Sequence, residues 1–113
     1  MSGTMSEFKE IIRGEIPVLV EFYADWYTPC KETLSYLDEL KQEYGCTVRF
    51  LKVNADNNQD ATAKYKVLGV PSFLLFKEGQ ILWRTQGVLS RFELKQAIEV
   101  ALLEEEQRQE LDK

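Results

Sequence analysis

Hydrophobic positions divide the chain into segments with helical spacing and segments typical of β-strands. Apolar residues three or four positions apart indicate amphipathic helices, and compact apolar runs between turn residues indicate buried strands. Helices are therefore predicted from Met5 to a stop at Gly14, at 30–44, at 59–65 and around a stripe at 94–102. Strands are predicted at 16–24, 46–53, 72–77 and 80–85.

Local signals indicate where several of these helices begin and end. Thr28 is a predicted N-cap, and Pro29 fits the first helical position because no N–H is needed there. Cys30 would then lie in the first turn, beside free backbone N–H groups and the positive end of the helix dipole. Gly45 should end that helix. Capping boxes, in which Ser or Thr is followed three residues later by Glu, are predicted at 4–7 and 90–93.

The order of these elements predicts one α/β domain. The segment 16–24 is apolar on both faces except at Glu21, as expected for a central strand covered by helices. A strand, a helix and a strand in succession imply a parallel pair with a right-handed crossover, and Glu78-Gly79 should join the last two strands as a hairpin. We expect a four-stranded mixed sheet with helices on both faces at residues 5–111, after an N-terminal tail at 1–4.

Composition and charge restrict the partners and the compartment. With 14 basic and 19 acidic residues the net charge is −5, which argues against nucleic acid and anionic membranes as partners because both attract clustered Lys and Arg. No apolar run approaches the ~20 residues of a membrane span, and the start does not resemble a signal peptide, so we expect a cytoplasmic monomer. Two cysteines, Cys30 and Cys46, and no histidine argue against a zinc site and a Cys-His dyad. We predict no metal and no cofactor.

The segment Trp26-Tyr27-Thr28-Pro29-Cys30-Lys31 resembles the active-site motif of the thioredoxin family, Trp-Cys-Gly-Pro-Cys-Lys. The departures are Tyr27, where the family has its nucleophilic cysteine, and Thr28, where it usually has glycine. The resemblance implies a thioredoxin-like fold that lacks the extra N-terminal strand, and a thiol-disulfide oxidoreductase ancestry with a role in cell redox homeostasis. It extends from Ile16 to about Leu103 through further features in register: Lys52, Asp56, Val70-Pro71, Gly79 and Gly87.

The resemblance assigns Cys30 to the second, buried cysteine of the motif, which resolves a mixed disulfide in the family. A helix terminus lowers a thiol pKa whereas burial raises it, so Cys30 is interpreted either as a single thiol or as a small buried apolar residue. Tyr27 cannot form a disulfide. It is interpreted either as a contact residue at the mouth of a binding groove or as an exposed aromatic residue on a loop.

Glu21 interrupts an otherwise apolar strand. Alternation places it on the same face as Leu19 and Tyr23, where burial should raise its pKa unless a cation compensates. The resemblance places Glu21 where thioredoxins carry a buried aspartate that handles the proton of the second cysteine, and it places Lys52 nearby. The predicted catalytic set is therefore Cys30, Glu21 and Lys52. A structural Glu–Lys pair between adjacent strands is the alternative interpretation.

Val70-Pro71 precedes the third predicted strand. The resemblance implies a cis-proline that faces the motif, where the backbone of the preceding residue pairs with an extended substrate chain, a form of β-augmentation. Such binding requires backbone and shape rather than a cysteine. Trp83 is interpreted as packing on a sheet face. The predicted substrate-binding residues are Trp26, Tyr27, Pro29, Val70, Pro71 and Gly87.

Three functions remain open from the sequence. The first is a thioredoxin-like protein that binds extended chains in the cis-proline groove with weak or no dithiol exchange. The second is an oxidoreductase in which Cys30 acts as a single thiol, with the mixed disulfide resolved by an external thiol or by Cys46. The third is a non-catalytic interaction domain. The expected partners are extended polypeptide segments or thiol and disulfide proteins.

Overall fold

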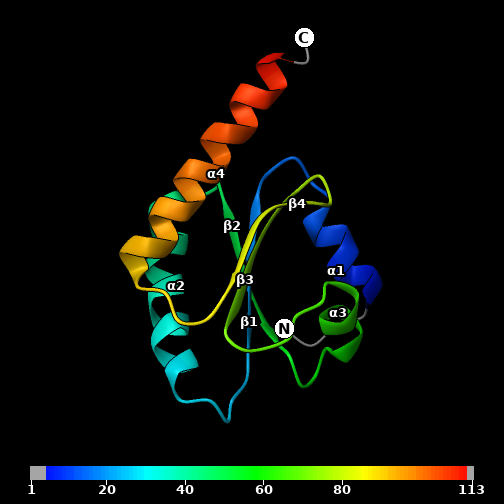
Figure 1. The fold of residues 1–113 in the computed structure, drawn as a ribbon, viewed down its shortest axis with the longest axis vertical. Coiled ribbons are helices and arrows are strands. Elements are labelled where there is room, and N and C mark those ends of the chain that lie inside the picture. The colour runs from blue at the N-terminus through cyan, green and yellow to red at the C-terminus, as the bar shows by residue number, and fades with distance from the viewer. Residues whose placement is uncertain (1–4, 112–113) are drawn as a thin grey trace.

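The computed structural model describes residues 5–111 and contains the predicted helices and strands in the predicted order (Figure 1). No helix in this range is both long enough and apolar enough to cross a membrane. The elements are α1 (Met5–Ile12), β1 (Val18–Tyr23), α2 (Pro29–Tyr44), β2 (Arg49–Asn54), α3 (Gln59–Lys64), β3 (Ser72–Lys77), β4 (Gln80–Gln86) and α4 (Arg91–Leu111).

The strands form one mixed sheet in the order β2-β1-β3-β4. β1 pairs parallel with β2 and antiparallel with β3, and β3 pairs antiparallel with β4. The helices α1 and α3 lie on one face of the sheet, and α2 and α4 lie on the other (Figure 1). The predicted four-stranded mixed sheet with helices on both faces is confirmed.

Alternation along β1 divides the core into two layers. Val18, Val20 and Phe22 pack with the α1 and α3 side, whereas Leu19 packs with residues of α2 and α4. Every one of these side chains is buried. The same alternation places Glu21 on the α2 side of the sheet, where its side chain is 0% exposed. The sequence thus positions an acidic residue inside the core, next to the start of α2.

The predicted helix ends are confirmed in part. In the box at the start of α4, the Glu93 amide donates to Ser90 Oγ and the Ser90 amide donates to Glu93 Oε1, both at 3.0 Å. Gly45 ends α2 with φ of 59°, a conformation that glycine adopts without a steric penalty. Thr28 occupies the cap position of α2, yet its side chain makes no capping hydrogen bond, because its backbone is already helical. The box predicted at 4–7 begins outside the described residues.

Several predicted boundaries are wrong by one to three residues, and the end of α4 by more; two of these errors matter for function. β2 begins at Arg49 rather than at Cys46, because Thr47 turns back and donates both its amide (3.1 Å) and its hydroxyl (2.7 Å) to the Tyr44 carbonyl. α4 continues to Leu111, well past the apolar stripe that predicted it. Figure 1 shows its last turns projecting beyond the sheet.

Candidate functional site

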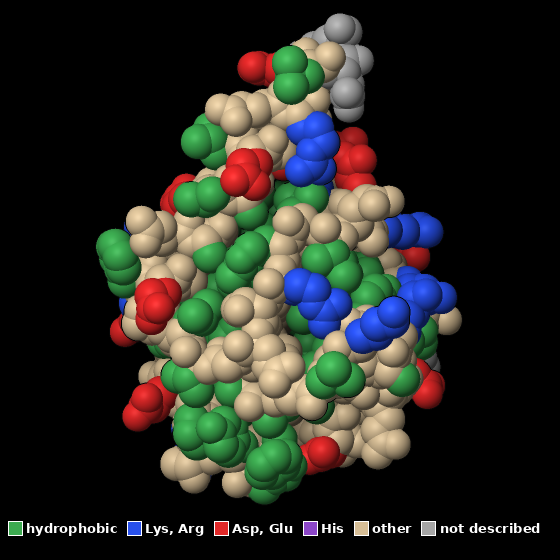
Figure 2. Space-filling model, viewed as in Figure 1, with side chains coloured by type: hydrophobic (Ala, Val, Ile, Leu, Met, Phe, Trp, Pro, Cys, Tyr) green, Lys and Arg blue, Asp and Glu red, His purple; other side chains and the backbone are tan. Residues whose placement is uncertain are grey.

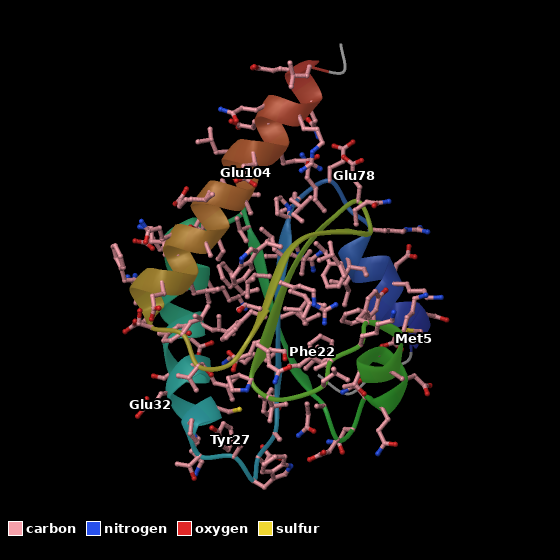
Figure 3. The ribbon with its side chains drawn as sticks, in the orientation of Figure 1. Met5, Phe22, Tyr27, Glu32, Glu78 and Glu104 are labelled. Atoms are coloured by element: carbon pink, nitrogen blue, oxygen red, sulfur yellow. The ribbon has the colours of Figure 1, made fainter. Side chains whose placement is uncertain are left out.

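The candidate site lies where β1 passes into α2. The chain leaves the sheet at Tyr23 and turns, with the Tyr27 amide donating to the Ala24 carbonyl at 3.3 Å. The Cys30 amide then donates to the Tyr27 carbonyl at 3.0 Å. Pro29 takes the first helical position as predicted. Figure 3 shows Tyr27 at this end of the molecule, just before the first turn of α2.

Cys30 is enclosed beneath this turn. Only 1% of its surface is exposed, and burial raises the pKa of its thiol above the ordinary value of 9.0. A hydrogen bond with the Ala24 backbone opposes that rise, and the negative charge of Glu21 adds to it. Because the thiolate is the reactive form of cysteine, the raised pKa reduces the fraction of Cys30 that is in the reactive form at neutral pH.

Glu21 is joined to Cys30 through Thr33. The Thr33 hydroxyl contacts Glu21 Oε2 and also lies 2.8 Å from the Cys30 carbonyl oxygen. Burial raises the pKa of Glu21 from 4.5 to about 7, while the Thr33 contact and the charge of Lys52 offset part of the rise. Since the hydroxyl has one proton, a neutral Glu21 that donates to Thr33 allows both contacts at once. The Glu21 carboxyl therefore gains or loses its proton near neutral pH.

Lys52 is placed opposite Glu21 in the β1–β2 register, as the sequence predicted. Its ammonium forms an ion pair with Asp38 of α2 at 2.8 Å. Oε1 of Glu21 has no hydrogen-bond partner among the described residues. The influence of Lys52 on Glu21 is smaller than that of burial, so the raised pKa reflects desolvation rather than a dominant Glu–Lys pair.

Trp26 and Tyr27 form an aromatic pair in the turn that precedes Cys30. Their ring centroids lie 5.9 Å apart, and the Trp26 indole N–H donates to Asp56 Oδ2 at 3.1 Å. Trp26 is nevertheless 70% exposed, whereas Tyr27 is half-buried. An indole fixed by a hydrogen bond but open to solvent presents a rigid apolar face.

A shallow cavity of about 300 Å³ lies next to Trp26, and both Trp26 and Val70 line it. Its wall includes Leu68, which is 89% exposed. The Val70–Pro71 bond is cis. Within the described residues, no backbone–backbone hydrogen bond involves Val70, whereas the Pro71 carbonyl accepts from the Gly87 amide at 2.9 Å. The backbone at Val70 therefore adjoins a cavity that both apolar and polar side chains line.

Of the predicted binding residues, only Trp26 and Val70 line the cavity itself. The other four do not line it: the Tyr27 ring contacts Trp26, Pro29 begins α2, and the Gly87 amide donates to the Pro71 carbonyl. Sequence reasoning missed Thr33, Leu68 and the role of Asp56 as acceptor for the Trp26 indole. The available signals were weak: Thr33 lies one helical turn after Cys30, and Leu68 is an apolar residue in a loop rich in turn residues.

Comparison with known proteins decides the family. The family model named Thioredoxin matches residues 1–100. The chain is 37% identical to Thioredoxin 1 of Chlorobaculum tepidum over 90 residues, which is 79% of this chain and 89% of that protein. It is 37% identical to Thioredoxin of Pseudomonas aeruginosa over 86 residues, which is 76% of this chain and 80% of that protein.

The chain belongs to the thioredoxin family. The fold agrees, since the crystal structure of thioredoxin from Trypanosoma brucei brucei superposes with a TM-score of 0.80 at 29% identity, covering 88% of this chain and 86% of that one. The name thioredoxin implies a thiol-disulfide oxidoreductase lineage. In this thioredoxin-family chain, the segment 26–31 contains one cysteine, Cys30, and carries a tyrosine at position 27.

The second cysteine of this thioredoxin-family protein cannot replace the missing one within a single molecule. Cys30 is the second residue of α2, a helix of 16 residues, and Cys46 lies two residues past its end. Such a helix is about 24 Å long, whereas bonded cysteines have Cα atoms no more than about 7 Å apart. The fold therefore excludes the version of the single-thiol mechanism in which Cys46 resolves the mixed disulfide.

The two cysteines should differ sharply in reactivity. Cys46 is exposed and Cys30 is buried, so brief treatment of the native protein with a bulky maleimide should modify Cys46 at least about tenfold faster, since reaction requires an accessible thiolate. Peptide mass mapping at short times gives the two rates, and labelling in denaturant provides the control in which both react. Faster labelling of Cys30 would contradict the buried-thiol interpretation.

Proposed function

We propose that this thioredoxin-family protein binds extended polypeptide segments in its cis-proline groove and carries out weak or no dithiol exchange. The observation that supports the proposal is the burial of Cys30, the one cysteine of the segment 26–31, together with Tyr27, which the resemblance places at the attacking position. A phenol cannot attack a disulfide to form a mixed disulfide, so the two-thiol cycle lacks its first step. The binding surface does not depend on that thiol.

The groove supports binding of an extended chain. An open backbone segment at Val70 can exchange hydrogen bonds with an added strand, and the wall formed by Trp26 and Leu68 can accept alternate side chains from it. Asp56 fixes the Trp26 ring, which lowers the entropy lost on binding. The partners we propose are unfolded or flexible segments of other proteins, bound by a monomer in the cytoplasm.

The arrangement of Glu21 and Cys30 supports the proposal that a proton-binding carboxyl is retained near the thiol although dithiol exchange is weak or absent. Their connection through Thr33 keeps a titrating carboxyl next to the thiol. Catalysis by Cys30 as a single thiol would require its sulfur to become exposed and an external thiol to resolve the product. A non-catalytic interaction domain differs from the main proposal in having no thiol exchange at Cys30 at all, so that the motif is only a relic.

The first test is for reductase activity. Wild-type protein should not raise the rate at which dithiothreitol reduces a protein disulfide, because Tyr27 cannot begin the exchange. The assay follows precipitation of the reduced substrate with and without the protein, with a two-cysteine thioredoxin as the positive control. Catalysis that approaches that control would contradict the proposal, and catalysis that needs added glutathione and disappears in Cys30→Ser would establish the single-thiol alternative.

The second test is for the groove. A cysteine-free, unstructured ten-residue peptide with alternating Val and Lys should shift the amide signals of Val70 and Gly87 and the indole signal of Trp26 in NMR titrations. Leu68→Gln should weaken that binding by about tenfold, since a central apolar contact contributes above 1 kcal/mol. Ile16→Gln, at an exposed position before β1, is the matched control. Shifts located elsewhere, or no loss in Leu68→Gln, would overturn the groove proposal.

A further inference from the structure

The helix α4 is longer than its packing on the domain requires. Leu94, Ile98 and Ala101 are buried against the α2 side of the sheet. Beyond them the helix contributes polar contacts of its own, with Arg108 paired to Glu105 at 2.9 Å and Gln109 donating to Glu105 at 3.1 Å. The family model matches only as far as residue 100. Beyond Leu102, no described residue of α4 belongs to either core cluster or packs against it.

A second apolar face runs along the outside of α4. Phe92 is 70% exposed, Val100 50%, Leu103 55% and Leu111 85%. Spacings of four and three residues place them, with two intervening glutamines, within one arc of the helix. Figure 2 shows hydrophobic side chains among acidic ones along α4 as far as its end. We call this face the α4 stripe, which consists of Phe92, Gln96, Val100, Leu103, Gln107 and Leu111.

The stripe continues into a groove between α4 and the edge strand β4. This cavity has a volume of about 360 Å³. Leu82 and Trp83 of β4 form one wall, and Ala97 and Val100 of α4 form the other. Val100 belongs to both the groove and the stripe. Together they provide a depression that can receive large apolar side chains next to a long apolar ridge.

Acidic residues border the stripe on both sides. Helical periodicity places Glu93 and Glu104 on the β4 side and Glu106 and Glu110 on the other side, and Figure 3 labels Glu104 on this part of α4. The nearby basic residues are already paired: Lys95 with Glu43 at 3.1 Å, Arg91 with Glu39 and Glu43 of α2, and Arg108 with Glu105 of α4. The free charge along the stripe is negative.

This charge pattern identifies the occupant. A second copy would bring its own glutamates against these, and an anionic membrane would be repelled in the same way. A helix with an apolar face flanked by Lys or Arg can pack that face on the stripe and pair its basic residues with the bordering glutamates. We propose that the α4 stripe and the adjoining groove bind an amphipathic helix of a partner protein whose apolar face has basic flanks. From Phe92 to Leu111 the stripe is about 29 Å long, which matches about 20 helical residues.

The experiment uses the full chain and two designed 20-residue peptides. The basic probe carries leucines at helical spacing on one face, lysines at the flanking positions and glutamines elsewhere, and the acidic probe replaces each lysine by glutamate. Calorimetry gives the affinities, and amide NMR shifts locate the binding. We expect the basic probe to bind at α4 and β4 and the acidic probe to bind at least about tenfold more weakly, with the difference shrinking as salt rises.

Matched variants distinguish specific binding at the α4 stripe from non-specific attraction between a cationic peptide and an acidic protein. Leu103→Gln should weaken binding of the basic probe by about tenfold or more, whereas Ile16→Gln should leave the affinity for that probe unchanged. The double change Glu104→Lys and Glu106→Lys should reverse the preference toward the acidic probe. The double change Glu15→Lys and Glu32→Lys alters net charge equally at exposed positions away from α4 and should leave the preference unchanged.

Three results would overturn the proposal. The first is equal binding of the two probes, and the second is NMR shifts confined to Trp26 and Leu68. The third is sedimentation of the free protein as a dimer that Leu103→Gln converts to monomer, because a second copy would then occupy the stripe. The test does not require reductase activity or binding in the cis-proline groove, so the α4 proposal can stand or fail independently of the proposed function.

Discussion

Replacing Tyr27 by cysteine should convert the protein into a catalyst of disulfide reduction. The Cys30 amide already donates to the Tyr27 carbonyl at 3.0 Å, so the two residues close a turn whose ends lie within about 7 Å, and disulfides form across about 4.4–6.8 Å. A thiol at position 27 would also lie at the start of α2, where the helix dipole stabilises a thiolate.

Each step of the restored cycle uses one of the two thiols, the Glu21 carboxyl or water, or the added dithiothreitol. The thiolate at position 27 attacks one sulfur of the substrate disulfide and releases the first substrate thiolate. Cys30 then attacks the sulfur at position 27 and releases the second, and its proton passes to the ionised fraction of Glu21 or to water. Dithiothreitol reduces the resulting 27–30 disulfide. Because the second attack is intramolecular, the variant should exceed wild type by about 100-fold or more.

The measurements are the rate of protein disulfide reduction and the redox titration of the variant. Tyr27→Ser, which fills the position without a thiol, is the matched control and should remain inactive. Adding Cys30→Ser to Tyr27→Cys should stop turnover at the mixed disulfide. A folded Tyr27→Cys protein whose two thiols never pair under oxidising conditions would show that the motif no longer has a redox geometry, and would favour the interaction-domain interpretation.

Regular patterns in the sequence were sufficient to predict the fold. Alternation along β1, the stop at Gly45 and the reciprocal Ser90–Glu93 contacts each depend on residues close in sequence, and each is present in the structure. The start of β2 was missed because apolar residues at 46–53 suggest a strand, while the Thr47 contacts with Tyr44 hold the first of them in a turn. Composition past residue 103 predicted a solvated end and could not indicate how far the helix continues.

Residues of the candidate site could be predicted from the sequence only where a polar residue interrupts an apolar segment or where a residue matches a motif. Glu21 in an apolar strand and Cys30 in the motif met these conditions. Thr33, Asp56 and Leu68 did not, since their roles depend on partners that the fold brings from other segments. The α4 stripe was hidden for another reason: apolar residues lie on two faces of one helix, so a search for a single amphipathic face finds only the buried one.

Glu21→Gln should stabilise the fold at neutral and alkaline pH. Burial raises the pKa of Glu21 from 4.5 in an ordinary setting to about 7 in the native state. Between pH 4.5 and about 7, Glu21 loses its proton in the unfolded chain but keeps it in the folded chain. The stability of the wild type therefore falls over this range and levels off above about pH 7. The difference corresponds to about 3 kcal/mol at 1.36 kcal/mol per unit, as an upper bound. Glutamine has nearly the same shape, stays neutral and can still bond with Thr33.

Urea unfolding between pH 4 and 8.5 measures this effect as the stability of Glu21→Gln minus that of wild type. The difference should be near zero at pH 4 and grow to as much as about 3 kcal/mol by pH 8. Glu32→Gln, at an exposed position in the first turn of α2, should show no such growth. Carbon-13 titration of the Glu21 carboxyl gives an independent midpoint near 7. If wild type instead gains stability relative to the variant from pH 4.5 to 7, the charge of Lys52 outweighs desolvation, and Glu21 is ionised in the native state.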